Sequence, residues 1–351
     1  MTPFDRASLV LAARRHPLAH AAAAGLERAA VPEGASVAIA VSGGADSMAA
    51  LVLLAGLAER GRVRVAAVLH VDHGLRDDSA LDADVVRQVA RGLALSDDAR
   101  RLSLAPGAGT PARARAARYQ ALADMASAHR ASTVITAHHA DDQLETVLLA
   151  LVRGTGLGGL GGMPERRPMA AGIDLVRPFL RVPRAALRDA ARALGVPWRE
   201  DPGNERWDVP RGRIRHSVGP QLEAIAPGTA ERVARTAELA RLGQQLLDAR
   251  VAALLHTDGS CPRSALREQP VALAASVVHR LVGHRLDDTE VWRAATAVID
   301  ASTEPRRFIL SDGAQLVLDA HALRVEPRGG GAPDAHSPPA ADASDDVRHR
   351  S

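Results

Sequence analysis

The chain has 351 residues, of which 46% are hydrophobic and 24% are charged. This length suffices for two domains or one large one, and the charged fraction is that of an ordinary folded protein. No apolar run approaches the roughly 20 residues that span a bilayer, and the N-terminus shows no secretory signal. The single cysteine, Cys261, excludes a disulfide framework and a cysteine-based zinc site. We therefore expect a cytoplasmic protein without a membrane partner.

Charge is distributed unevenly along the chain. All 44 basic residues are arginine and the formal net charge is +3; a coding bias explains the absence of lysine most simply. Residues 177–215 contain ten arginines against five acids, and residues 99–123 contain five arginines and no acid. These two stretches indicate a polyanionic partner, with scattered helix-surface arginines as the alternative.

The first part of the chain alternates between strand and helix patterns. Short apolar, β-branched runs predict strands at 36–41, 63–71 and 132–137, with weaker candidates at 101–104 and 173–176. Periodic apolar patterns predict helices at about 46–60, 78–93, 112–129 and 140–152. This alternation predicts an α/β fold, a Rossmann-like parallel sheet with helices on both faces. Ligands of such sheets bind at the carboxyl ends of the strands, near a switch point.

The pattern changes after Pro220. It predicts a long amphipathic helix, two further helices and a β meander, at 229–255, 270–283, 288–300, 307–311, 314–318 and 322–326. We therefore expect four regions: a helical lead-in, an α/β domain, a smaller and mostly helical domain with the meander, and a disordered tail, at 1–33, 34–220, 221–327 and 328–351.

The strongest local signal is the sequence SGGADS at residues 42–47, between a predicted strand and a predicted helix. Its two glycines let the backbone approach a ligand closely, and the helix N-terminus attracts phosphate. The carboxylate of Asp46 suits this place if Mg²⁺ lies between it and a phosphate, or if it only caps the helix. The loop resembles the pyrophosphate-binding loop of the N-type ATP pyrophosphatases, which split ATP into AMP and pyrophosphate.

A second motif, TAHHADDQLETVLLALVRGTGLGGLGGM, spans residues 136–163. The spacing of His138, Asp142 and Glu145 places them along one face of a helix near its N-terminal end. Such a group could hold Mg²⁺, bind an ammonium group or move a proton, and the alternative is simple complementation of the helix dipole. The glycine-rich stretch 154–162 is either a mobile lid or a linker.

Two more segments are expected at the same crevice. HVDHGLR at residues 70–76 ends the second strand and brings His70, His73 and Arg76 there. In RAARY, Arg115 and Arg118 lie one helical turn apart. An arginine pair suits phosphate or carboxylate, with a plain surface face as the alternative.

The order of these motifs, together with RPFL at 177–180, resembles the tRNA(Ile)-lysidine synthase family over about residues 34–220. A later stretch at 200–220 resembles the family's DxSN…RNxIR…P segment. It departs at Gly203 and Gly212, where serine and asparagine are usual, and Pro111 stands where glutamate is expected. These departures concern the detail of the substrate contacts.

The resemblance implies a ligase that acts on the isoleucine tRNA with a CAU anticodon. ATP adenylates the C2 carbonyl oxygen of the wobble cytidine, and the side-chain amine of free L-lysine then attacks C2 and expels AMP. It implies ATP as substrate, with Mg²⁺ held by Asp46 and Asp142. The implied ATP-binding residues are Ser42, Gly43, Gly44, Ala45, Asp46, Ser47 and His70.

The implied catalytic residues are Asp46, Arg118, His138, Asp142 and Glu145. The residues implied for tRNA or lysine are Arg115, Arg211, Arg213 and Arg215. A base or desolvation must free the lysine amine, whose pKa is roughly 10.4 in water; our hypothesis is that Asp142 or Glu145 acts as this base. The arginine-rich segment and the C-terminal domain would hold the tRNA phosphates, and a homodimer is compatible with the sequence.

Three other activities fit the sequence less well. A tRNA thiolase of the same superfamily typically uses cysteines or an iron–sulfur cluster, whereas Cys261 stands alone and late in the chain. A glutamine-dependent amide ligase needs a glutaminase nucleophile or a partner subunit. A nucleotide-binding module without catalysis would not need the acidic cluster that follows residue 137.

Overall fold

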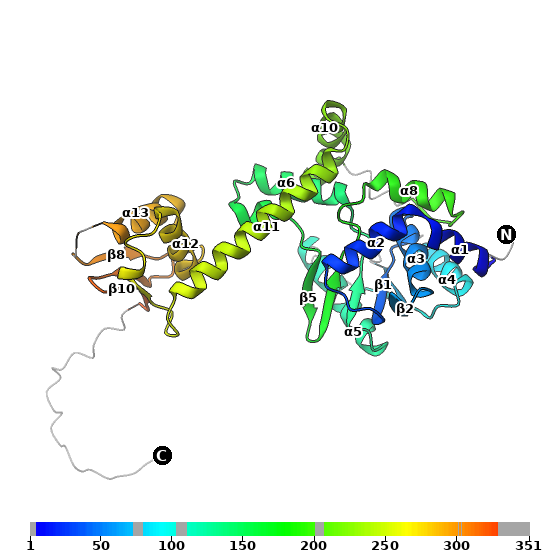
Figure 1. The fold of residues 1–351 in the computed structure, drawn as a ribbon, viewed down its shortest axis with the longest axis horizontal. Coiled ribbons are helices and arrows are strands. Elements are labelled where there is room, and N and C mark those ends of the chain that lie inside the picture. Colours follow the sequence, from blue (N-terminus) through cyan, green and yellow to red (C-terminus); the bar gives the residue numbers. More distant parts are fainter. Residues whose placement is uncertain are drawn as a thin grey trace, which may run out of the picture. The chain divides into compact units, whose positions relative to one another are not determined.

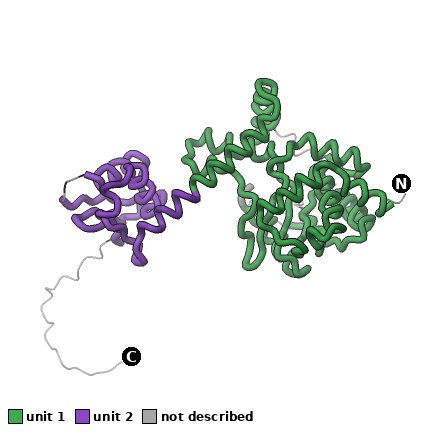
Figure 2. Tube along the Cα trace, viewed as in Figure 1, with its two compact units in different colours: residues 1–244 green, residues 245–351 purple. Residues whose placement is uncertain are grey.

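In a computed structural model, the chain divides into two compact units, Met1–Gln244 (unit 1) and Gln245–Ser351 (unit 2) (Figure 2). The division falls inside helix α11 (Thr229–Leu254), later than the predicted boundary at residue 220. The structure describes residues 5–72, 80–102, 111–200, 207–300, 302 and 304–328. The predictions for His73, Arg76, Gly203 and the tail beyond residue 328 lie outside these residues.

Unit 1 is built on a six-stranded sheet with the order β3-β2-β1-β4-β6-β5 (Figure 1). Its strands are β1 (Ala35–Ala40), β2 (Val63–Asp72), β3 (Asp97–Arg101), β4 (Thr133–Ile135), β5 (Arg166–Ala170) and β6 (Ile173–Val176). The predicted Rossmann-like sheet is confirmed, because β1, β2, β3, β4 and β6 pair in parallel.

The sheet departs from the prediction at both edges. Strand β5 pairs antiparallel with β6 and was not predicted, because its half-exposed sequence RRPMA lacks an apolar run. At the other edge, β3 begins four residues before the predicted segment 101–104 and overlaps it at Arg101, and its sequence DDARR is also largely polar. Edge strands bury less side-chain surface than central ones, so the apolar signal fades there.

Helices cover both faces of this sheet. They are α1 (Arg6–Arg15), α2 (Pro17–Arg28), α3 (Ala45–Ala58), α4 (Ala80–Gly92), α5 (Pro111–Ala128), α6 (Ala140–Val152), α7 (Leu157–Leu160), α8 (Arg184–Ala193), α9 (Pro210–Arg213), the π-helical segment η2 (Ile214–Val218) and α10 (Gly219–Ile225). Along β1, Val37 and Ile39 join a core shared with α1, α2, α3, α4 and α8. Ala38 and Ala40 point to the opposite face and share a core with α5. This two-residue alternation is that of a strand buried on both faces.

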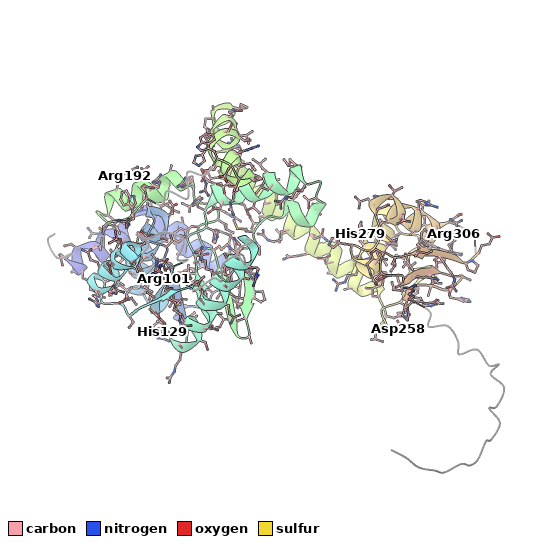
Figure 3. The ribbon with its side chains drawn as sticks, turned by 180° about the vertical axis from the view of Figure 1, so that it is seen from behind. Arg101, His129, Arg192, Asp258, His279 and Arg306 are labelled. Atoms are coloured by element: carbon pink, nitrogen blue, oxygen red, sulfur yellow. The ribbon has the colours of Figure 1, made fainter. Side chains whose placement is uncertain are left out.

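Unit 2 has its own core. It contains α12 (Val271–Val282), α13 (Asp288–Ile299), the short η3 (Arg263–Ala265) and an antiparallel sheet β7-β10-β9-β8. Its strands are β7 (Cys261–Pro262), β8 (Arg306–Ile309), β9 (Gln315–Leu318) and β10 (Ala322–Glu326). Polar side chains such as Asp258, His279 and Arg306 lie on its outside (Figure 3). Within the described ranges, no helix is long and apolar enough to cross a membrane.

Candidate active site

The SGGADS loop connects β1 to α3, and the segment 136–139 connects β4 to α6. Strands β1 and β4 are neighbours, with β2 on the other side of β1 and β6 on the other side of β4. From β1 the sheet continues to β2 and β3 on one side and to β4 and β6 on the other, so the strand order reverses between β1 and β4. The loops that lead from β1 to α3 and from β4 to α6 lie at this position. This is the switch point at which α/β sheets of this kind bind ligands.

The loop holds its shape through its two serines. The Ser47 hydroxyl donates to the Gly44 carbonyl oxygen at 2.9 Å and lies 3.1 Å from the Ser42 hydroxyl. Gly43 has φ +91°, and a Cβ there would lie 3.2 Å from the Asp82 Cβ, so glycine fits both the backbone and the space. Helix α3 begins without a side-chain cap. Its N-terminal N–H groups are therefore suited to an anion, whereas the Ser47 hydroxyl is already engaged within the loop.

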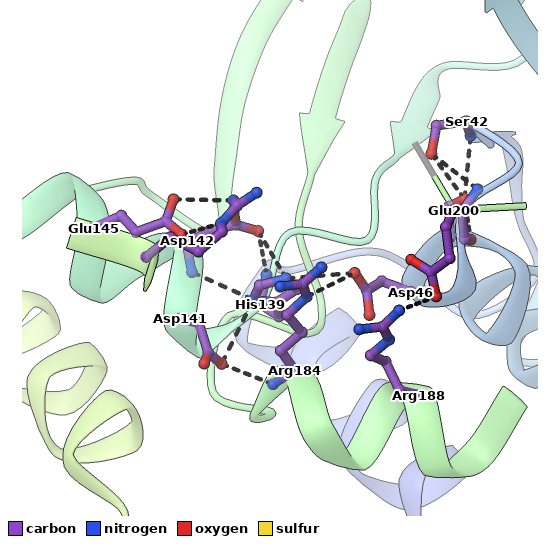
Figure 4. A network of polar contacts seen from close by, with 12 residues as sticks. Ser42, Asp46, His139, Asp141, Asp142, Glu145, Arg184, Arg188 and Glu200 are labelled. Atoms are coloured by element: carbon purple, nitrogen blue, oxygen red, sulfur yellow. Dashed lines mark hydrogen bonds and ion pairs between the residues drawn. The ribbon is translucent and has the colours of Figure 1, made fainter. Parts of the chain in front are cut away.

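A polar network extends from this loop to helix α6 (Figure 4). Asp46 Oδ2 lies 3.7 Å from His139 Nε2 and 3.5 Å from Arg184 Nε. The same His139 nitrogen lies 3.4 Å from Asp142 Oδ2. One histidine thus connects the carboxylate of the loop with the first carboxylate of the predicted acidic cluster.

His139 is the residue that the sequence reasoning missed. It caps helix α6: its Nδ1 accepts the Asp142 backbone N–H, and the Asp142 carboxylate accepts the His139 backbone N–H. Burial lowers its pKa, but the Asp142, Asp46 and Asp141 carboxylates outweigh burial and raise it overall. A polar residue followed three positions later by an acid, just before an apolar helix, is a capping-box pattern that could have revealed it.

Glu145 lies inside the site and is fully paired. Its side chain is 3% exposed; Oε2 accepts from Arg211 Nε at 2.5 Å and Oε1 accepts from Arg215 Nε at 2.6 Å. Arg211 Nη2 also reaches Asp142 Oδ1 at 3.3 Å. The structure therefore joins the 211–215 segment to α6 through two buried or nearly buried acids, a pairing across more than sixty residues of chain.

His138 does not share the helical face that the spacing predicted, because α6 begins only at Ala140. Its Nδ1 lies 2.8 Å from the Thr136 hydroxyl. Burial and the nearby Arg177 and Arg118 charges lower its pKa to about 3, against the opposing effect of Asp142. His138 is therefore a neutral imidazole at physiological pH, a hydrogen-bonding group and not a cation.

The remaining predicted residues lie around this centre. His70 is buried, with Nδ1 2.9 Å from the Val41 carbonyl oxygen, and burial lowers its pKa. Burial also lowers the pKa of Arg118. Arg115 is exposed and donates to the Tyr119 hydroxyl at 3.0 Å. Arg213 is also exposed, and it lies outside the Glu145 ion pairs described above.

One atom of the network is suited to a metal. Asp46 Oδ1 is buried and has no hydrogen-bond partner in the described part of the chain. Asp142 is less suitable, since its oxygens already accept from His139 and Arg211. No group of three or more potential ligands forms among the described residues. Mg²⁺ commonly takes one or two protein carboxylates and completes its shell with phosphate and water.

A glycine loop of this form at the switch point defines the class: the chain is a PP-loop protein, and the PP-loop domain family matches residues 18–222. Within this class the chain belongs to the tRNA(Ile)-lysidine synthase family. The synthase of Salinispora tropica is 40% identical over 257 residues, which cover 71% of this chain and 76% of that protein. The synthase of Pseudomonas syringae pv. tomato is 35% identical over 290 residues, which cover 79% of this chain and 64% of that protein.

The matched region is thus less than two thirds of the Pseudomonas protein. Among solved structures, the U34-tRNA thiolase NcsA from Methanococcus maripaludis has a TM-score of 0.53 and 16% identity to this chain, over 63% of this chain and 77% of that one. At this identity the likeness supports the fold alone.

Proposed function

We propose that this chain is a cytoplasmic ligase that attaches L-lysine to C2 of the wobble cytidine in the isoleucine tRNA with a CAU anticodon. ATP is consumed and AMP and pyrophosphate are released. The observation that carries the proposal is the continuous network from Asp46 of the phosphate loop through His139 to Asp142. It sets a carboxylate cluster against the nucleotide site, where an adenylated base and an incoming amine must meet.

The first step is adenylation of the cytosine C2 oxygen. That oxygen attacks the α-phosphorus of ATP, and the bond from this phosphorus to the pyrophosphate oxygen breaks. The backbone N–H groups at the start of α3 bind the leaving pyrophosphate, and Asp46 Oδ1 would hold Mg²⁺. The bound ion would neutralise charge on the phosphates during transfer. The loop is formed by Ser42, Gly43, Gly44, Ala45 and Ser47, and buried His70 contacts the carbonyl oxygen of Val41, which precedes it.

In the second step the lysine side-chain amine forms a bond to C2, and the C2–oxygen bond breaks as AMP leaves with the electron pair. The nitrogen loses a proton. We assign its transfer to Asp142, because the Glu145 oxygens each accept a guanidinium at 2.6 Å or less, whereas the Asp142 oxygens accept at longer distances, 3.1 Å from the His139 backbone N–H and 3.3 Å from Arg211. Glu145 instead positions Arg211 and Arg215. The cation Arg118 lies close enough to neutral His138 to contribute to its lowered pKa.

The tRNA must deliver its wobble base out of the anticodon stack into this pocket. The exposed arginines Arg115 and Arg213 are available for its phosphates, and binding through phosphates predicts a steep salt dependence. We propose that unit 2 also contacts the tRNA, and a homodimer remains compatible with the chain.

The decisive experiment incubates the protein with ATP, lysine and the tRNA transcript and analyses the digested nucleosides by mass spectrometry. We expect lysidine from the wild type and at least a hundredfold slower formation by Asp46→Asn. Asp84→Asn is the matched control, because it changes an exposed carboxylate on α4. Wild-type protein that forms no lysidine, or an Asp46→Asn variant with full activity, would overturn the proposal.

A further inference from the structure

An exposed aromatic pair lies beside the candidate active site. Trp207 is 57% exposed, although tryptophan is among the side chains that gain most from burial. One face of its indole stacks on the His216 imidazole, with ring centroids 4.9 Å apart and planes 26° from parallel. The pair therefore presents a large flat ring to solvent with a second ring supporting it from behind.

The pair is anchored to the reaction centre through the backbone. His216 follows Arg215 directly in η2, and Arg215 together with Arg211 is bound to the buried Glu145. Arg211 and Arg215 are four residues apart on one helical face, whereas Arg213 and His216 are three apart on another. One face of the segment 211–216 thus forms ion pairs with Glu145, and its other face contacts Trp207.

A cation completes this second face. Arg213 is exposed, and its Nε donates to the Trp207 carbonyl oxygen at 3.4 Å. A planar aromatic surface with a guanidinium beside it complements a nucleobase attached to its phosphate, since bases stack on aromatic rings and arginine pairs with phosphate. An apolar peptide would gain nothing from the cation.

We propose, on the basis of the function proposed above, that the Trp207–His216 pair is a stacking platform for one unpaired anticodon-loop base next to the wobble cytidine. When the wobble base leaves the stack to enter the pocket, its neighbour loses a stacking partner. The Trp207 ring replaces that partner, so the platform offsets part of the cost of extracting the wobble base. Trp207 is therefore a positioning residue for the RNA.

The first test measures binding of the full-length protein to the tRNA transcript. Replacing Trp207→Ala should weaken tRNA binding about tenfold, the range found for loss of one base–aromatic stack. It should raise KM for tRNA and leave KM for ATP unchanged. Trp207→Phe, which keeps a flat ring, should restore most of the affinity, and Leu11→Ala, which removes an exposed apolar side chain on α1, should have no effect. Equal tRNA affinity of Trp207→Ala and wild type overturns the platform.

A second measurement separates stacking from a folding role and from phosphate contact. In a Trp198→Phe, Trp292→Phe background Trp207 is the one remaining tryptophan, so its emission can be excited selectively over that of Tyr119. An RNA stem-loop with the CAU anticodon should quench this emission, whereas a duplex without a loop should not. Equal quenching by both RNAs, or none by the stem-loop at saturation, rejects the platform. If wild-type protein forms no lysidine, the proposed function fails; if it forms lysidine and Trp207→Ala binds normally, only the platform fails.

Discussion

Among the described residues, each unit buries one arginine almost completely, and the hydrogen bonding of the two guanidinium groups differs. In unit 2, Arg263 is 1% exposed and donates to the backbone carbonyl oxygens of Ala297, Val298, Asp300 and Asp319 at 2.9 to 3.3 Å. In unit 1, Arg177 is 2% exposed and donates to the Pro164 carbonyl oxygen, but its Nε has no hydrogen-bond partner in the described chain.

This difference in hydrogen bonding distinguishes Arg263, a structural residue, from Arg177, which lies near the candidate active site. Arg263 satisfies the carbonyl groups at the end of α13 that a helix cannot pair internally. Arg177 lies close enough to His138 to lower its pKa. The net charges of the two units also differ. Residues 1–244 contain 32 arginines and 26 acids, whereas residues 245–351 contain 12 arginines and 15 acids. We infer that unit 1 supplies most of the attraction for RNA phosphates.

The largest effect is expected from removing the structural arginine. Arg263→Ala should lower the free energy of unfolding of unit 2 by about 3 kcal/mol or more, because it leaves several buried carbonyl groups without a donor. Thermal unfolding followed by circular dichroism measures this, with exposed Arg267→Ala as the control. An unchanged midpoint for Arg263→Ala would show that its hydrogen bonds do not stabilise the unit.

The second largest effect is expected from breaking the ion pairs between α6 and the 211–215 segment. Glu145→Ala leaves two guanidinium groups beside the site without their main partner, so the segment should shift. We expect lysidine formation to fall about a hundredfold, or about 2.7 kcal/mol in activation free energy. Asp312→Asn, which removes an exposed acid–arginine pair in unit 2, should leave the rate unchanged. A Glu145→Ala variant with wild-type rate would contradict the positioning role.

The position of the site could be predicted from the sequence, but its ion pairs could not. The SGGADS and TAHH motifs each follow a strand, and the carboxyl ends of parallel strands meet, so the place of the site was predictable. The pairing of Glu145 with Arg211 and Arg215 was not, because no local pattern connects residues so far apart. His139 was not predicted because it is the N-cap of α6 and lies outside the i, i+4, i+7 spacing of His138, Asp142 and Glu145. Strand β5 was not predicted because an exposed edge strand has no apolar signature.

The third effect is a pH dependence of stability. His138 has a folded-state pKa of about 3, below its usual value, chiefly because of burial. As pH falls below about 6.5 the unfolded chain takes up a proton that the folded protein does not, so stability is complete above that pH and declines toward pH 3. His138→Asn should reduce this decline by roughly 2 kcal/mol between pH 7 and 5 in urea unfolding. Identical pH profiles for variant and wild type would contradict the low pKa.

The smallest effect tests the charge difference between the two units directly. If unit 1 makes most phosphate contacts, Arg213→Gln should reduce the slope of log Kd for tRNA against log salt concentration by about 1, the value expected for one lost contact. Arg293→Gln, which changes an exposed arginine on α13 of unit 2, should change the slope little. The two slope changes are more informative than the two affinities, because the salt dependence reports phosphate contacts, whereas the affinity also includes base stacking. Equal changes would mean that unit 2 holds the RNA phosphates as closely as unit 1 does, despite its excess of acids.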